Sequence, residues 1–378
     1  MAIFSYLNEM VQREASDLYL TVGVPPTLRK DDILMALNET NLSLEDIEMM
    51  LGEVLTSRQR REYDTNMELN IALDMGDRGR FRINVLRQKQ FPALVIRRIT
   101  SNIPSFEELN LPRQIFEDLA MTKRGLILVS GVTSSGKSTS LAAMVDYRNK
   151  HAPGHIITIE DPVEYFHSHH KSIVTQREVG IDTQSYQIGL KNSLRQKPDV
   201  IMIGEIRDAE VMEQALSAAE TGHLCLATIH TNNASQALER IINFFPETKQ
   251  NQIRMNLTLN LKAIVGQRLV MSKEGHAVLA IEVLLNEALI KDLILKGETH
   301  KIREVMAQNK PAGMQVFDQS LFNLYKNGLI TEETAILESD VSSDMRMRIQ
   351  QEKLRMGGSD SGFSDNITEQ IDTSRLSL

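Results

Sequence analysis

The sequence predicts an α/β protein whose second part carries a parallel-rich sheet, preceded by a small α+β domain. Two observations lead to this prediction. Residues 66–73 and 79–88 alternate between apolar and polar side chains around a turn at Gly76–Gly79, which is typical of an antiparallel hairpin. From about Phe106 onward, short apolar segments alternate with helical patterns, and this alternation is typical of a parallel sheet.

The composition is that of a globular protein and excludes several classes of function. The 378 residues are 42% hydrophobic and 24% charged, which is enough for two domains with separate cores. Lys and Arg number 42 against 50 Asp and Glu, so the formal net charge is −8 and a general nucleic-acid binder is not expected. The only cysteine, Cys225, excludes an internal disulfide and a zinc site built on paired cysteines.

The N-terminal segment and the apolar runs bear on localisation. Residues 1–20 lack the order of basic, apolar and small residues that marks a signal peptide. No apolar run approaches the length that crosses a bilayer. We therefore expect a cytoplasmic protein whose membrane contact comes only through partners.

Residues 1–104 are expected to form the first domain and the linker that follows it. Ser43 and Asp46 have the spacing of a capping box, which predicts that a helix begins there. The predicted elements are a helix over 2–15, a strand over 17–22, a helix over 43–51, and strands over 66–73, 79–88 and 91–99.

Residues 105–355 are expected to form the second domain, after a linker at 100–105. Its predicted strands cover 125–130, 156–159, 200–203 and 224–229, and its predicted helices cover 208–219, 234–244, 251–265 and 320–327. Residues 356–378 are polar and rich in Ser, Asp and Gly, so we expect a disordered tail.

The segment from Gly131 to Thr139 is the strongest functional signal. Four residues separate Gly131 from Gly136, and Lys137 and Ser138 follow, between a predicted strand and a predicted helix. This arrangement turns backbone N–H groups toward an anion at a helix N-terminus, which argues against a chance Gly/Ser turn. Lys137 would reach the β- and γ-phosphates, and the Ser138 hydroxyl would hold Mg²⁺. The expected nucleotide-binding residues are Gly131, Val132, Thr133, Ser134, Ser135, Gly136, Lys137, Ser138 and Thr139.

Acidic residues follow two of the predicted buried strands. Glu160, Asp161 and Glu164 come after the strand at 156–159, and Glu205 comes shortly after the strand at 200–203. Sites in parallel sheets lie at the carboxyl ends of the strands. Nucleotide hydrolysis needs a group that orients the metal and a group that positions water, and these carboxylates are candidates for both. A solvated turn residue is the alternative for any single one of them.

Two histidines flank the predicted strand at 224–229. His223 and His230 would sit at opposite ends of that strand, and by spacing alone a structural role is favoured for each. A metal pair would lack an adjacent carboxylate or cysteine pattern. A second group, His167, His169 and His170, is expected in a loop, where metal capture is a weaker alternative.

Arginines crowd the hairpin of the first domain. Alternation puts Arg80 and Arg82 on one face of their strand, and Arg97 and Arg98 end the next strand. One interpretation is a solvated face. The other is an arginine that reaches a phosphate, including one on a neighbouring subunit.

These segments together resemble the secretion-type (type II/IV) hexameric ATPases, and more narrowly the type IV pilus retraction ATPases of the PilT/PilU family. The resemblance covers about residues 1–340. Gly131–Thr139 is similar to the Walker A box, Thr158–Glu164 to the Asp box, Gly204–Asp208 to Walker B, Ala219–Thr231 to the His box, and Gly79–Asn84 to the arginine-bearing strand.

The resemblance implies a RecA-like P-loop ATPase domain behind a PAS-like N-terminal domain. It also implies a cytoplasmic homo-hexamer that uses ATP and Mg²⁺ and works with an inner-membrane pilus platform protein at the base of the pilus. The implied roles are general base for Glu164, the Mg²⁺ site for Glu205 with Ser138, nucleotide sensing for His223 and His230, and phosphate contact for Arg80 and Arg97.

Departures from the family pattern refine this expectation. Ser134 stands where the family usually has glycine, and it would be strained if its φ were positive. Leu289–Ile294 reads LIKDLI where PilT-type ATPases carry AIRNLI, and one cysteine excludes the four-cysteine zinc element of assembly ATPases. The altered LIKDLI motif and the polar tail at 356–378 favour a PilU-like accessory to a PilT-type ATPase in pilus retraction and twitching motility.

Three alternatives stay open. The chain could be a self-sufficient PilT-like motor, or a slow-hydrolysing regulatory subunit, for which Ser134 and the altered LIKDLI stretch are the support. A nucleic-acid translocase would share the P-loop core. The net charge and the lack of a nucleic-acid motif argue against the translocase, and stimulation of ATP hydrolysis by DNA would revive it.

Overall fold

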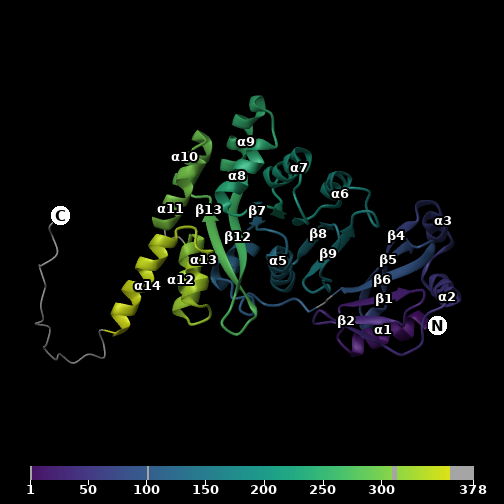
Figure 1. Cartoon of the computed structure of the whole chain (residues 1–378). Coiled ribbons are helices and arrows are strands. Elements are labelled where there is room, and N and C mark those ends of the chain that lie inside the picture. The colour runs from purple at the N-terminus through teal and green to yellow at the C-terminus, as the bar shows by residue number, and fades with distance from the viewer. Residues whose placement is uncertain (1, 100–101, 309–312, 358–378) are drawn as a thin grey trace, which may run out of the picture.

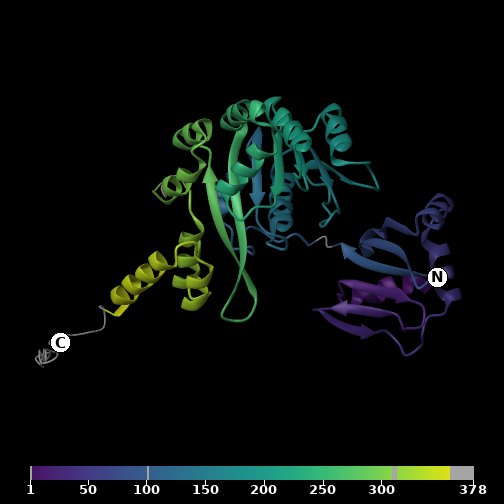
Figure 2. The same cartoon turned by 45° about the horizontal axis from the view of Figure 1, so that its top comes forward.

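Two β-sheets, each with its own core, organise the chain (Figure 1). The structure is a computed structural model that describes residues 2–99, 102–308 and 313–357. The first sheet lies at one side of the second, and the C-terminal helices lie at the other side, in both views (Figures 1 and 2). Within the described ranges, no helix is long and apolar enough to cross a membrane.

The first sheet is antiparallel and has the strand order β3-β2-β1-β6-β5-β4. Phe81, Ile83 and Val85 alternate into the core, so Arg80 and Arg82 fall on the opposite face of β5. The elements are α1 (Ala2–Gln12), β1 (Asp17–Thr21), β2 (Thr27–Lys30), β3 (Ile33–Ala36), α2 (Leu44–Val54), α3 (Ser57–Asn66), β4 (Glu68–Asp74), η1 (Gly76–Arg78), β5 (Arg80–Gln88) and β6 (Phe91–Ile99).

The second sheet has the order β13-β12-β7-β11-β10-β8-β9 and is parallel from β12 to β9, with β13 antiparallel at one edge. Its central strands are apolar on both faces because helices cover both faces. The strands are β7 (Gly125–Ser130), β8 (Gly154–Glu160), β9 (Ser172–Glu178), β10 (Val200–Ile203), β11 (Leu224–Ile229), β12 (Leu261–Met271) and β13 (Ala277–Leu285).

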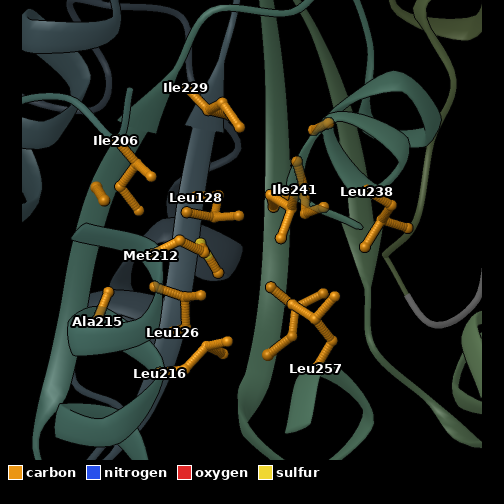
Figure 3. Close-up of a cluster of buried hydrophobic side chains, with 14 of the residues drawn as sticks. Leu126, Leu128, Ile206, Met212, Ala215, Leu216, Ile229, Leu238, Ile241 and Leu257 are labelled. Carbon is orange, nitrogen blue, oxygen red and sulfur yellow. The ribbon is translucent and has the colours of Figure 1, made fainter. Parts of the chain in front are cut away.

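Helices cover the two faces of the second sheet unequally. Helices α4 (Arg113–Ala120) and α5 (Lys137–His151) pack on one face. The other face is covered by α6 (Tyr186–Ser193), α7 (Ala209–Glu220), α8 (Ala234–Asn243), α9 (Glu247–Asn260), α10 (Ala288–Lys296) and α11 (Ile302–Gln308), with η2 (Leu194–Gln196) and η3 (Thr299–Lys301) between them. Figure 3 shows the core between the sheet and this second group of helices. Leu126 and Leu128 of β7 lie there beside Met212 of α7, and Leu257 of α9 lies nearby.

Three helices pack near the β12–β13 hairpin and form a separate small core. Phe317 and Leu321 are fully buried there against Val270 and Ala280 of the hairpin. The helices are α12 (Phe317–Lys326), α13 (Glu332–Glu338) and α14 (Ser342–Gly357).

The predicted α/β fold is confirmed, and one predicted helix extends too far along the chain. The four strands predicted in the second domain and the capping box at Ser43 and Asp46 are present. The helix predicted over 251–265 is wrong beyond Asn260, because the residues from Leu261 onward form β12 between β7 and β13. Residues 100–101 of the predicted linker and 358–378 of the predicted tail lie outside the described residues.

Candidate functional site

The segment from Gly131 to Gly136 joins the end of β7 to the start of α5. A Cβ atom on Gly131 would lie 2.7 Å from the carbonyl oxygen of Gln267, so only glycine fits there. Gly136 has a φ of +86° directly before α5, a backbone conformation that glycine adopts most easily. Each glycine of the motif is therefore favoured for a different reason: a close backbone contact at Gly131 and a positive φ at Gly136.

The backbone of Ser134 is strained, as we expect for a residue with a Cβ atom and a positive φ. Its φ is +61°, in the left-handed region, where a residue with a Cβ atom is disfavoured. This side chain also lines the cavity in front of the loop. The Gly-to-Ser departure therefore places about 1 kcal/mol or more of backbone strain at the nucleotide loop.

Lys137 is held by the loop that it follows. Its Nζ donates to the carbonyl oxygens of Gly131 at 2.9 Å and Val132 at 2.6 Å, and the side chain is largely buried. Burial lowers the pKa of the Lys137 ammonium, and the nearby carboxylates of Glu205 and Glu164 partly oppose this shift. Lys137 therefore places a positive charge on the cavity wall, where it would attract an anion.

Glu160 is a buried carboxyl at the end of β8. Its Oε1 accepts from the Thr158 hydroxyl at 2.6 Å and from Nε2 of Gln176 at 3.3 Å. Burial raises the pKa of Glu160 to about 7, although these hydrogen bonds favour the charged form. Glu164, four residues later, is exposed and lines the same cavity.

Glu205 approaches the cavity from the loop after β10. Its Oε2 accepts from Nε of Arg207 at 2.7 Å, and its Oε1 lies 3.4 Å from Nε2 of His230. Burial lowers the pKa of His230, and the positive charge of Lys137 lowers it further, while Glu205 opposes both effects. These contacts link the ends of β10 and β11 beside the loop.

Side chains from the segment after β8 and from α6 also line the cavity. The hydroxyls of Tyr165 and Thr139 lie 2.9 Å apart, which ties α5 to the residue after Glu164. His167 is almost fully buried, and burial lowers its pKa to about 4. Tyr186 reaches the cavity from α6, and burial raises its pKa.

The structure therefore brings several of the predicted residues to one cavity of about 230 Å³. The predicted residues on its wall are Thr133, Ser134, Lys137, Ser138, Glu164, Glu205 and His230. Glu160 and Asp161, named as candidate carboxylates, also line the wall, and the wall residues to which the sequence analysis gave no role in the nucleotide site include Tyr165, His167 and Tyr186. Glu160, Tyr165 and His167 lie in or beside segments already singled out, whereas the sequence offers no signal for Tyr186.

His223 does not reach this cavity. It precedes β11 at the edge opposite His230, and its Nδ1 lies 3.0 Å from the carbonyl oxygen of Ala218. Six strand residues separate the two histidines, a span of about 20 Å at roughly 3.3 Å per residue. Of the two histidines that flank β11, His230 is the one beside the candidate nucleotide site of its own chain.

The two arginines of the first sheet also lie away from the cavity wall. Nε of Arg97 donates to Oδ1 of buried Asp17 at 2.8 Å, while most of the Arg97 side chain is exposed. The Arg80 guanidinium carbon lies 5.8 Å from the centre of the Phe166 ring. Phe166 follows Tyr165 and precedes His167, which both line the cavity, whereas Arg80 and Phe166 line a separate pocket.

The donor set fits a magnesium ion held jointly with a nucleotide. Across the described part of the chain, no group of three or more His, Cys, Asp or Glu side chains could hold a metal ion, the tract at His167–His170 included. Mg²⁺ usually takes one or two protein oxygens and completes its shell with phosphates and water. Ser138 and Glu205, both on the cavity wall, supply that kind of partial set.

Comparisons with known proteins agree along most of the chain. The family model described as type II/IV secretion system protein matches residues 2–321. The chain is 52% identical to the type IV pilus ATPase PilU of Pseudomonas aeruginosa, over 91% of this chain and 90% of that protein. It is 35% identical to the type IV pilus retraction ATPase PilT of the same species, over 89% of this chain and 97% of that protein.

Solved structures also match most of the chain. The crystal structure of the pilus retraction motor PilT with bound ADP matches with a TM-score of 0.83 and 40% identity, over 90% of this chain and 98% of that one. The Legionella pneumophila ATPase DotB matches with a TM-score of 0.77 at 23% identity, over 89% of this chain and 94% of that one, which is a likeness of fold.

Proposed function

The chain belongs to the type II/IV secretion system protein family, and we propose that it is an ATP-hydrolysing motor that drives or assists type IV pilus retraction. The observation that carries the proposal is the convergence on one cavity of Lys137, two carboxylates at the ends of parallel strands, and His230. The likeness to PilU and PilT supplies the biological context.

The chemistry proposed for the site is hydrolysis of the terminal phosphate of ATP. Lys137 exchanges its loop carbonyls for the β- and γ-phosphate oxygens and offsets their charge. Glu164, exposed at the cavity, orients the attacking water and accepts its proton, which leaves ADP and phosphate as products. His230 and Arg207 hold Glu205 in place from the side.

Ser138 and Glu205 would hold Mg²⁺ in this proposal. When bound, the ion supplies charge that offsets the negative charge of the phosphates. Glu205 already accepts from Arg207, so its carboxylate orientation is set by the protein before any ion arrives.

We place the site in a ring of six subunits, with domains at residues 1–104 and 105–355. Arg80, Arg97 and His223 lie away from their own chain's cavity, so any contact they make with a nucleotide would be to that of a neighbouring subunit. The proposed partners are a PilT-type ATPase and an inner-membrane pilus platform protein, at the cytoplasmic base of the pilus.

An accessory role like that of PilU is the favoured form of the proposal. Identity to PilU is 52% and identity to PilT is 35%, over similar shares of the chain. A slow-hydrolysing regulatory subunit is a second candidate, because Ser134 carries a left-handed backbone in the nucleotide loop. A self-sufficient motor is the third.

The central test replaces Lys137. We expect Lys137→Ala to abolish ATP turnover, since the cation that offsets phosphate charge is removed. Phosphate release by purified wild type and variant measures this, and circular dichroism checks that the variant is folded. Normal turnover in a folded Lys137→Ala protein would refute the proposed site.

A further inference from the structure

Gln267 is a buried amide directly behind the phosphate-binding loop. It lies on β12, where the preceding residue, Gly266, pairs with Ser130 at the end of β7. Ala263 and Val265 point into the core beneath α5, and the two-residue period of a strand puts Gln267 on the same face. The Gln267 side chain is fully buried at a position where its neighbours are apolar.

Gln267 contacts the loop at both ends. Its Nε2 donates to the Ser140 hydroxyl at 2.5 Å, in the first turn of α5. Its backbone carbonyl lies so close to Gly131 that a Cβ atom there would be 2.7 Å away. One residue therefore bears on the start of the loop through its main chain and on the helix after the loop through its side chain.

Buried polar atoms without partners gather around this contact. In the described part of the chain, Oε1 of Gln267 and the hydroxyls of Ser130 and Ser135 are buried and make no hydrogen bond. The amide of Gln267 therefore interacts with this region through its hydrogen bond to Ser140.

We propose that Gln267 is a positioning residue that holds the phosphate-binding loop and the first turn of α5 in register. It acts through the loop and touches no reacting atom. The inference rests on the proposed nucleotide site and adds to it a residue from β12, outside every segment singled out for chemistry. Burying an amide is unfavourable unless it is hydrogen-bonded, so the Ser140 contact is the expected source of its effect.

The informative substitution is Gln267→Met, which keeps the length of the side chain and removes the amide. Loosening the loop weakens phosphate contacts in the ground state and the transition state alike. We therefore expect Kd for a fluorescent ADP analogue and KM for ATP to rise roughly 3- to 10-fold, the effect of one buried hydrogen bond, with kcat changed less than about 2-fold. A role limited to stability would lower the melting temperature and leave KM unchanged.

Two further variants keep the test decisive. Ser140→Ala removes the acceptor by a smaller change, and it should raise Kd similarly; the double variant should be no worse than Gln267→Met alone. Asn286→Leu is the matched control, since this buried amide donates to backbone oxygens of Leu257, Thr258 and Leu261, away from the cavity wall. It should lower the melting temperature without changing Kd.

The outcomes separate this inference from the proposed function. Failure of wild type to bind the ADP analogue would refute the nucleotide site itself. If wild type binds, an unchanged Kd in Gln267→Met and Ser140→Ala overturns the role of Gln267 alone. An equal rise in Asn286→Leu would also overturn it, because general loosening would then explain the effect. Should Gln267→Met fail to fold, Ser140→Ala decides.

Discussion

Glu164 and Glu205 reach the cavity from different strands, and their surroundings suggest different tasks. Glu205 is held between Arg207 and His230, so its carboxylate is fixed and suits an ion or its water. Glu164 is exposed at the cavity, where it can meet a water molecule. The buried Glu160 precedes both of them in the chain, and burial raises its pKa to about 7.

These surroundings lead to a prediction for the general base. Glu164→Gln keeps the shape of the side chain but cannot accept a proton, so kcat should fall by about 10² or more while nucleotide still binds. Single-turnover hydrolysis and binding of the ADP analogue measure the two effects separately. Should Glu205→Gln be inactive and Glu164→Gln remain active, the two roles are reversed.

Ser134 offers a second prediction at the scale of one residue. Glycine removes the strain of a +61° φ, while it adds flexibility to the unfolded chain. Ser134→Gly should therefore raise the free energy of unfolding by up to about 1 kcal/mol, and turnover should rise if the strain slows the loop. Ser134→Ala is the control, because it keeps the Cβ atom. Equal denaturation midpoints for the Gly and Ala variants would show that the backbone is not strained.

At the scale of elements, short buried strands were the most predictable part of the fold. β7, β10 and β11 are continuous apolar runs bounded by polar or glycine residues, and they sit where the pattern put them. The sequence pattern predicts a helix across the start of β12, because its first residues, Leu261–Val265, continue the apolar pattern of α9. The conformation of β12 is settled by pairing with β7, which is distant in the chain, and with β13, the next strand.

The sequence likewise predicts one part of the candidate site and misses another. The meeting of Lys137, Glu205 and His230 follows from the rule that parallel strands end at one edge of their sheet. The place of Gln267 could not be foreseen, because it depends on β12 lying beside β7. The distance of Arg80 and His223 from the cavity likewise depends on tertiary packing, and no local pattern reveals it.

The β5–β6 hairpin carries the prediction about arginine. If Arg80 serves the nucleotide of a neighbouring subunit, Arg80→Ala should lower turnover at least about 10-fold and leave nucleotide affinity nearly unchanged. Mixing Arg80→Ala with Lys137→Ala subunits should then restore part of the activity, because some sites would receive one intact residue from each chain. Phosphate release by the mixture measures this.

The control measurements show whether Arg80 takes part in hydrolysis or only faces solvent. Unchanged kinetics in Arg80→Ala would return the arginine to an ordinary solvent-facing role, and no recovery on mixing would place its action within its own chain. Arg97→Ala needs a stability measurement beside it, because it leaves buried Asp17 without its cation. We expect its free energy of unfolding to fall by about 1 kcal/mol.

At the scale of the whole molecule, the question is whether this chain retracts a pilus alone. Its LIKDLI stretch lies on α10, where Leu289 is 52% exposed and open to a partner. That stretch differs from the AIRNLI of PilT-type ATPases, while the sequence as a whole is nearer to PilU than to PilT. An accessory that adds to the work of a PilT-type hexamer agrees with both facts.

The last prediction therefore concerns cells that lack both retraction ATPases. Expression of this protein alone should leave twitching and retraction absent, and expression beside a PilT-type ATPase should raise retraction force above that of the PilT-type ATPase alone. The Lys137→Ala variant at matched expression tells whether its own ATP hydrolysis supplies that force, since a purely structural partner would act equally well without turnover. Full recovery of twitching by this chain alone would make it a self-sufficient motor, because no second ATPase would then be present to supply the work.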